Sequence, residues 1–324
     1  MNILVTGGAG YIGSTTANLL LDKNNQVTII DNLSTGDIKN IPKKAHFIKT
    51  SIDNKKKISN LLKKKKFDLL IHFAAFIDVE ESVKKPQKYY KNNFLRTLKL
   101  LKICKSNGIN KLIFSSTASV YGNSNSGTVY EHSIKNPVSP YALSKLKCEN
   151  FIKKEKKIKY VILRYFNVAG ADLKLRSGLI SKKKSTHLIK KICENYINKK
   201  SIEIFGKDYP SRDGTAIRDY IHVADLANAH FEAAKYLMKG KKSVTFNCGY
   251  GTGYSVRRVI DSFNKLNKRK LRFIYGQRRK GDIFKLIANT NKIKKILNWK
   301  PKHNSLSKIL SSSLNWEKKI SKRK

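Results

Sequence analysis

The chain has 324 residues with 40% hydrophobic side chains, enough for one large or two ordinary domains, and no apolar run reaches the length of a membrane span. Its 68 Lys and Arg against 22 Asp and Glu give a net charge of +46, but these cations are spread along the whole chain without a recognisable nucleic-acid-binding module. The four Cys form no C-x-x-C pair, so we expect a cytoplasmic protein without disulfides, metal site, membrane association or specific nucleic-acid partner, whose charge causes only nonspecific adhesion to polyanions at low salt.

The first half of the chain alternates strand and helix signals. It opens on "MNILVTGG", which runs directly into an apolar strand without a charged n-region and long apolar h-region, so we expect no secretory leader. Buried strands are predicted at 2–7, 26–31, 67–74, 111–116 and 159–167. Helical periodicity between them predicts helices at 11–23, 54–66, 87–107 and 141–157. This alternation predicts an α/β fold with a Rossmann-type, doubly wound parallel sheet.

The second half of the chain has a different texture, with loops rich in Gly, Asp and Tyr and several shorter helices. Such a pattern is typical of a smaller α/β domain placed against the carboxyl edge of a sheet. We therefore predict a first domain at 1–167, to which a segment at about 215–247 returns, and a second domain made of 168–214 and 248–324.

A glycine-rich turn follows the first strand in "NILVTGGAGYIGS" and leads into the first helix. Glycines at 7, 8, 10 and 13 permit a tight turn and a close backbone approach to a pyrophosphate at the helix N-terminus. Asp31, at the end of the second strand and 18 residues after Gly13, can bind the adenosine ribose hydroxyls and would repel the extra phosphate of NADP. The pattern favours NAD; the alternative is a tight turn followed by a strand-end Asp without a ligand.

The stretch "SPYALSK" places an aromatic hydroxyl and an ammonium four residues apart. Ser139 can cap a helix whose first turn holds Pro140, so Tyr141 and Lys145 would share one helical face. A nearby cation favours the phenolate, and we therefore expect the pKa of Tyr141 to be lowered toward neutrality, as a general acid–base group requires. The alternative is an ordinary exposed Tyr–Lys pair.

These blocks, taken together, resemble the extended short-chain dehydrogenase/reductase family and, within it, the UDP-hexose 4-epimerases of the UDP-glucose 4-epimerase type. The resemblance runs from residue 1 to about 318. It is carried in order by "GGAGYIG", "DNLS", "HFAA", "ESVKKPQKYYKNN", "FSSTASVYG", "SPYALSK", "LRYFNVAGA", "IFGKDYPSRDGTAIRDYIHVADLA" and "RRKGD". It implies an NAD-binding first domain, a UDP-sugar-binding second domain and a homodimer formed through helices of the first domain.

The resemblance also implies roles for single residues. Those matching the catalytic group are Thr117, Tyr141 and Lys145. Those matching cofactor contacts are Gly7, Gly10, Tyr11, Ile12, Gly13, Asp31, Asn32, Phe73, Ala74, Asn93, Ser115, Tyr141, Lys145 and Tyr165. Those matching UDP-sugar contacts are Thr117, Asn167, His187, Leu188, Arg218, Tyr220, Arg279, Asp282 and Leu286. The chain departs from the family pattern at two positions near the cofactor. It has Ile77 where many relatives carry a Lys, and Ser51 where they usually carry an Asp.

The implied reaction inverts C4 of a hexose attached to UDP. Tyr141 as phenolate takes the O4 proton while bound NAD accepts the C4 hydride, and the 4-keto sugar turns its other face before the hydride returns. Leu286 stands at a sugar-pocket position and is smaller than Tyr, so we expect UDP-GlcNAc and UDP-GalNAc to be accepted beside UDP-glucose and UDP-galactose. The alternative is that Leu286 is simply a core residue.

Three other functions are alternatives to the epimerase. A nucleotide-sugar 4,6-dehydratase needs an Asp-Glu pair directly after the active-site Thr, where this chain has Ala118 and Ser119. A net dehydrogenase could use the same three residues and would consume free NAD. A non-catalytic polyanion-binding protein is suggested only by the charge, and a complete catalytic group argues against it.

Overall fold

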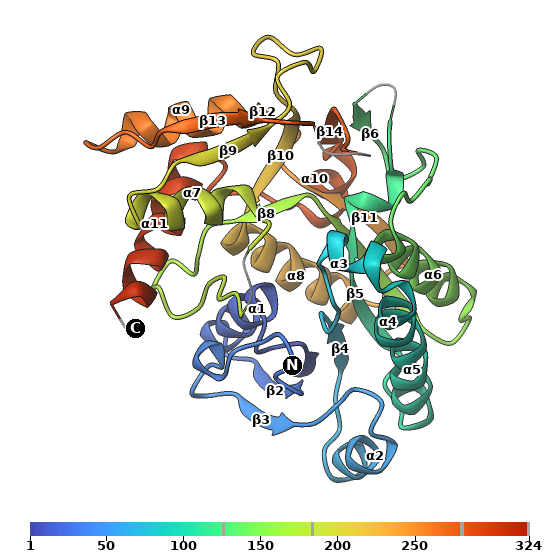
Figure 1. Cartoon of the computed structure of the whole chain (residues 1–324). Coiled ribbons are helices and arrows are strands. Elements are labelled where there is room, and N and C mark those ends of the chain that lie inside the picture. Colours follow the sequence, from blue (N-terminus) through green and yellow to red (C-terminus); the bar gives the residue numbers. More distant parts are fainter. Residues whose placement is uncertain (125–126, 183–184, 279–281, 323–324) are drawn as a thin grey trace.

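The core of the protein is a seven-stranded parallel sheet in the order β11-β7-β5-β4-β1-β2-β3 (Figure 1). The computed structural model describes residues 1–124, 127–182, 185–278 and 282–322. The strands are β1 (Asn2–Thr6), β2 (Gln26–Asp31), β3 (His46–Lys49), β4 (Leu69–His72), β5 (Lys111–Thr117), β7 (Lys159–Tyr165) and β11 (Val244–Cys248). The predicted Rossmann-type α/β architecture is confirmed, with all five predicted strands present; β3 and β11 were not predicted as strands.

Helices cover both faces of this sheet. One face carries α1 (Tyr11–Asp22) and α8 (Val223–Met238), which pack against each other, and the other carries α2 (Lys55–Lys64), α5 (Arg96–Ser106) and α6 (Pro140–Lys154). Strand β1 shows how one strand serves both faces, because successive side chains point to opposite sides. Ile3 and Val5 join the cluster under α1 and α8, whereas Leu4 joins the cluster under the other helices.

The predicted helix at 87–107 forms in three connected parts. It runs through α4 (Pro86–Tyr89), a π-helical turn η2 (Tyr90–Leu95) and α5, preceded by the short α3 (Val79–Lys84). The other three predicted helices match α1, α2 and α6 within a few residues at their ends. π-Helical turns are rare and occur often at functional sites.

Smaller sheets form above the carboxyl ends of the large one. One has the order β12-β10-β14-β6 with β8 paired to β10, and the other joins β13 to β9. Their strands are β6 (Thr128–Val129), β8 (Asn167–Ala169), β9 (Ile202–Phe205), β10 (Ile217–His222), β12 (Gly253–Ser255), β13 (Phe273–Gly276) and β14 (Lys285–Ala288). The helices are α7 (Leu188–Ile197), α9 (Val256–Leu266), α10 (Asn291–Leu297) and α11 (Leu306–Ser321), with one-turn 3₁₀ segments η1 (Ile38–Asn40) and η3 (Ala118–Tyr121) elsewhere.

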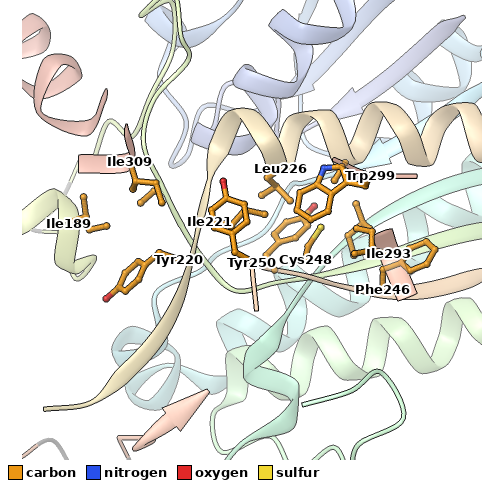
Figure 2. Packing of buried hydrophobic residues seen from close by; sticks show 14 of the residues in the cluster. Ile189, Tyr220, Ile221, Leu226, Phe246, Cys248, Tyr250, Ile293, Trp299 and Ile309 are labelled. Atoms are coloured by element: carbon orange, nitrogen blue, oxygen red, sulfur yellow. The ribbon is translucent and has the colours of Figure 1, made fainter. Parts of the chain in front are cut away.

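The segment after α10 is fastened to the start of α8. Trp299 stacks on Tyr250, with ring centroids 6.5 Å apart, and Figure 2 shows both rings beside Leu226. The buried Asp225 carboxylate accepts hydrogen bonds from the Tyr250 hydroxyl at 2.6 Å and from the backbone N–H groups of residues 302 and 303.

The segment at about 215–247, predicted to return to the first domain, contributes to two sheets. Helix α8 and strand β11, which begins within this segment, lie with the large sheet, whereas β10 lies in a smaller one. The domain boundaries themselves stay a prediction.

Within the described ranges, no helix is long and apolar enough to cross a membrane. The four Cys are buried and unpaired with one another. 

Candidate active site

The turn between β1 and α1 leaves no room for side chains at two glycines. Gly7 has φ +73°, and a Cβ there would lie 2.5 Å from the backbone nitrogen of Ala74. A Cβ on Gly13 would overlap the carbonyl oxygen of Gly7. Gly10 is the N-cap residue of α1 and provides no side-chain cap, so the first N–H groups of the helix are not capped by a side chain at that position. This backbone cradle is the arrangement that a pyrophosphate requires.

The predicted ribose-binding carboxylate lies beside that cradle. Asp31 ends β2, is 8% exposed and accepts hydrogen bonds from the backbone N–H of Ala9 at 3.0 Å and of Leu33 at 2.8 Å. Burial raises the pKa of Asp31, an effect that the two backbone donors oppose. A pocket of about 80 Å³ is lined by the predicted cofactor residues Gly7, Gly10, Asp31, Asn32, Phe73 and Ala74. An elongated dinucleotide fits a glycine cradle that leads to a buried carboxylate.

The π-helical turn places the predicted cofactor residue Asn93 inside the protein. Its side-chain amide donates to the Phe76 carbonyl at 2.9 Å and to the Ser144 hydroxyl at 3.1 Å, and its oxygen accepts from the Phe76 N–H at 2.8 Å. Asn93 thus fixes the loop after β4, which carries Phe73 and Ala74, to helix α6. Among the two departures from the family pattern, Ser51 lines the same pocket and hydrogen-bonds Asp53, whereas Ile77 is exposed.

The three predicted catalytic residues meet at the carboxyl end of β5. Thr117 ends that strand, while Tyr141 lies in the first turn of α6, which Ser139 caps by accepting the Ala142 N–H at 3.2 Å. Burial raises the pKa of Tyr141 to about 12, and a side-chain hydrogen bond with Thr117 opposes this rise. The Tyr141 hydroxyl is therefore buried in contact with Thr117, and the alternative of an ordinary exposed Tyr–Lys pair is excluded.

The expected lowering of the Tyr141 pKa by Lys145 is wrong for the protein chain by itself. The Lys145 ammonium is buried, donates to the Ser115 carbonyl oxygen at 2.7 Å and lies 4.9 Å from the centre of the Phe114 ring. Burial also lowers the pKa of Lys145 to about 8. The prediction considered only charge at helical spacing, whereas removal of both groups from water dominates their pKa values.

Further predicted cofactor residues surround this centre. Tyr165 ends β7, pairs with Thr117 in the sheet register and places its hydroxyl 2.5 Å from Nε2 of His230. Tyr11, in the first turn of α1, donates its hydroxyl to the Gly170 carbonyl at 2.6 Å, and Ile12 beside it is half-buried. The Tyr11 contact ties the cofactor cradle to the loop that follows β8.

Most of the predicted UDP-sugar residues line a second, larger pocket. It has a volume of about 230 Å³, and its described lining includes Asn167, His187, Leu188, Arg218, Tyr220 and Asp282. Arg218 Nη2 donates to Asp282 Oδ1 at 2.7 Å, and the Tyr209 hydroxyl donates to Asp282 Oδ2 at 3.1 Å. These contacts orient the guanidinium in the pocket wall. Arg279 lies outside the described residues.

Leu286 is placed differently from the other predicted substrate residues. It lies in β14 beside Arg218 in the sheet register, is 6% exposed and packs in a small core with Ala118, Tyr121 and Phe166. It is not among the described residues that line the larger pocket. Ala118 and Tyr121 belong to the segment that follows Thr117 in the chain, so Leu286 packs against the segment next to the catalytic threonine.

Two buried ion pairs near the site were not predicted. Glu149 and Arg164 pair at 2.6 Å beside the catalytic segment, and Lys190 pairs with Glu317 at 2.5 Å in the wall of the larger pocket. The first has a weak signal in the sequence, because Glu149 follows Lys145 by one helical turn on the buried face of α6. The second joins α7 to α11, more than a hundred residues apart, and no local pattern announces it.

Comparison with known proteins places this geometry in a family. Residues 3–249 match the model of the NAD dependent epimerase/dehydratase family. The chain belongs to that family. It is 41% identical to a UDP-glucose 4-epimerase of Azospirillum brasilense over 322 residues, which cover 98% of this chain and 92% of the relative.

Solved structures of family members have the same fold. A UDP-glucose-4-epimerase from Stenotrophomonas maltophila with bound NAD and formylated UDP-arabinopyranose matches with a TM-score of 0.95 at 31% identity, covering 100% of both chains. The UDP-Glc/GlcNAc 4-epimerase from Campylobacter jejuni matches with a TM-score of 0.85 at 40% identity, covering 98% of this chain and 99% of that one. The likeness extends through both pockets and the catalytic segment, since nearly the whole chain is covered.

Proposed function

We propose that this protein is a UDP-hexose 4-epimerase that interconverts UDP-glucose and UDP-galactose with bound NAD. One observation carries the proposal: Thr117, Tyr141 and Lys145 converge at the carboxyl end of the sheet, in a chain that is 41% identical over nearly its whole length to a UDP-glucose 4-epimerase. The enzyme is an epimerase of the nucleotide-sugar class, and its cofactor is NAD.

The cradle around Gly7 and Gly13 and the Asp31 carboxylate fit NAD, as their geometry indicates. When bound, NAD accepts the hydride from C4 of the sugar and returns it to the opposite face. Tyr141 removes the O4 proton and later gives it back, and Thr117, hydrogen-bonded to Tyr141, positions that proton. Lys145, held by the Ser115 carbonyl, binds the nicotinamide ribose and supports the phenolate.

The UDP group is an anchor in the larger pocket, which leaves the hexose free to turn over. Arg218 is the phosphate-binding side chain within the described residues, because a guanidinium pairs phosphate oxygens bidentately. Its contact with Asp282 sets the plane of the guanidinium before substrate arrives. We assign Arg279 to the same anchor on the sequence pattern alone. Asn167, His187, Leu188 and Tyr220 complete the lining of this pocket.

The N-acetyl sugars UDP-GlcNAc and UDP-GalNAc are proposed as further substrates. A solved structure at 40% identity is that of a UDP-Glc/GlcNAc 4-epimerase, which supports this breadth. The sequence pattern supports it too, because Leu286 is smaller than Tyr at that position; in the structure Leu286 packs in the core with Ala118 and Tyr121 and is not among the described residues that line the larger pocket. Homodimer formation and a cytoplasmic location stay predictions.

The test is to incubate purified protein with UDP-glucose, without added NAD, and to identify the products. UDP-galactose at equilibrium with UDP-glucose, with no net NADH, is expected. Stoichiometric NADH would instead make the protein a dehydrogenase, and a product lighter by one water would make it a dehydratase. Salt at a concentration that abolishes polyanion binding should leave sugar turnover unchanged. That result would show that the high net charge is not needed for catalysis.

A further inference from the structure

His230 is a buried residue on α8 that touches two residues of the proposed cofactor site and has no role in the mechanism above. Its Nε2 lies 2.5 Å from the Tyr165 hydroxyl oxygen. Its ring centroid lies 4.8 Å from that of Phe73, which lines the cofactor pocket. The side chain is fully enclosed, since its exposed fraction is 0%.

The hydrogen bonds of His230 determine which ring nitrogen carries the proton. Nδ1 lies 2.8 Å from the Leu226 carbonyl oxygen, one helical turn earlier. A carbonyl oxygen only accepts, so Nδ1 must donate and carry hydrogen. Burial lowers the pKa of His230 to about 4, so the ring is neutral at physiological pH. Nε2 is then an acceptor, and Tyr165 must donate its own proton to it.

This assignment fixes what Tyr165 can offer on its other side. With its proton directed at His230 and one lone pair hydrogen-bonded by the Ser115 side chain, the Tyr165 oxygen has one lone pair left for a ligand. Burial raises the pKa of the Tyr165 hydroxyl, so it keeps this proton. Tyr165 lies close to the acid–base centre, because it pairs with Thr117 in the sheet register. Two buried tyrosines near one reaction centre thus receive different tasks.

We propose that His230 is a positioning residue for the cofactor, which holds Tyr165 as a neutral hydrogen-bond acceptor for an N–H group of bound NAD and leaves proton transfer to Tyr141. The inference rests on the proposed function only in taking NAD to bind beside Tyr165. It explains why a histidine, rather than an apolar residue, is enclosed between Tyr165 and the start of α8.

The experiment measures the Kd for NAD by calorimetry on protein stripped of cofactor, with thermal unfolding of each variant beside it. Tyr165→Phe and His230→Leu should each weaken NAD binding about tenfold, and His230→Gln, which keeps an acceptor toward Tyr165, should stay within about threefold of wild type. The double variant His230→Leu with Tyr165→Phe should be no weaker than either single one. Tyr236→Phe is the matched control, because it removes a tyrosine hydroxyl on α8 that donates to the Lys242 carbonyl.

Each outcome has a defined meaning. Unchanged NAD affinity in Tyr165→Phe overturns the proposal, even where His230→Leu binds weakly, because the effect would then act through packing on Phe73. Equal losses in His230→Gln and His230→Leu overturn it too, since the acceptor would be irrelevant. Tight NAD binding by wild type without epimerisation of UDP-glucose sinks the proposed function while the affinity pattern still decides this inference. Wild-type protein that binds no NAD overturns both.

Discussion

Arg164 and Glu149 form a bidentate ion pair inside the protein, with Arg164 Nε 2.9 Å from Glu149 Oε1 and Nη2 2.6 Å from Oε2. The Ser116 hydroxyl donates to the same carboxylate at 2.6 Å, and Arg164 Nη1 donates to the Tyr121 hydroxyl at 2.7 Å. Burial alone would raise the pKa of Glu149, but the hydrogen bonds and charge of Arg164 hold it below its ordinary value. The pair joins α6, which carries Tyr141, to the two strands that carry Ser116 and Arg164.

Glu149→Gln should lower the free energy of unfolding by about 3–5 kcal/mol, because it leaves the Arg164 charge buried without a counter-ion. Urea denaturation measures the change. Lys153→Met removes the more exposed partner of the same carboxylate, 3.4 Å away, and should cost no more than about 1 kcal/mol. Equal midpoints for Glu149→Gln and wild type would show that the buried pair is not a determinant of stability.

Tyr141→Phe should fold and keep NAD but lose turnover by orders of magnitude, since only the proton acceptor is removed. The measurements are kcat on UDP-galactose and the NAD content of the purified protein. Tyr236→Phe, distant from the site on α8, should turn over at the wild-type rate. Retention of more than about a tenth of the activity by Tyr141→Phe would exclude Tyr141 as the base.

The pKa of Tyr141 should fall when the oxidised cofactor binds. In the protein chain alone burial raises it to about 12, and the positive nicotinamide ring of NAD⁺ is the charge that can reverse this effect. Ultraviolet titration of wild type minus Tyr141→Phe isolates this phenolate. Protein loaded with NADH, whose ring is neutral, is the control and should titrate at higher pH than the NAD⁺ form. Identical titration of the two forms would contradict the proposed electrostatic role.

Leu286→Tyr should depress kcat/KM for the N-acetyl sugars more than for UDP-glucose and UDP-galactose, because the sequence pattern assigns this position to the sugar pocket, where a larger ring would exclude the 2-acetamido group. The same change also overfills the core with Ala118 and Tyr121, which costs about 1–3 kcal/mol of stability. Leu286→Met, similar in volume, is the control for that core. Equal loss on both sugar pairs would assign Leu286 to packing alone, and wild type without N-acetyl activity would exclude the broader substrate range.

Acid should destabilise the fold through three buried histidines. Burial lowers the pKa of His72 to about 3, and of His222 and His230 to about 4. The unfolded chain binds these protons near pH 6.5 and the native state does not, so stability is full above that pH and falls as pH drops toward 4, by about 1.4 kcal/mol per pH unit for each histidine. Urea midpoints measured between about pH 7 and pH 4.5 give the slope of stability against pH. In His230→Gln the slope should fall by the contribution of one histidine, about 1.4 kcal/mol per pH unit. An unchanged slope would contradict the assignment of His230 as a neutral buried group.

The sequence predicted those parts of the fold that depend on local patterns. The strands 2–7 and 111–116 each contain three consecutive apolar residues, and a side chain at Gly7 or Gly13 would overlap neighbouring backbone atoms. Strand β3 was missed because "HFIK" is short and only partly buried, so it carries no apolar run. Strand β11 was not predicted because its place depends on pairing with β7, about 80 residues earlier in the chain, which no local window contains.

The candidate site was predicted in its residues more than in its interactions. Motif spacing placed Tyr141 and Lys145 on one helix, and the structure has both there. The direction of the Tyr141 pKa could not be read from spacing, because it depends on how completely the fold removes the hydroxyl from water. The partners of Asn93, Asp282 and His230 likewise come from elements far apart in sequence and become visible only when the sheet is assembled.

The position of β11 at the edge of the large sheet has a consequence for biosynthesis. A ribosome that has completed residue 167 has synthesised six of the seven strands of the large sheet, yet β7 still lacks its outer neighbour until Cys248 has been made. The hydrogen bonds to the Asp225 carboxylate form later still, because their backbone donors are at residues 302 and 303. An unpaired strand edge invites contact with other chains. The nascent protein therefore passes about a quarter of its translation, from Tyr165 to Cys248, with an open β7 edge, and shielding of that edge by a chaperone would act at this stage rather than after release.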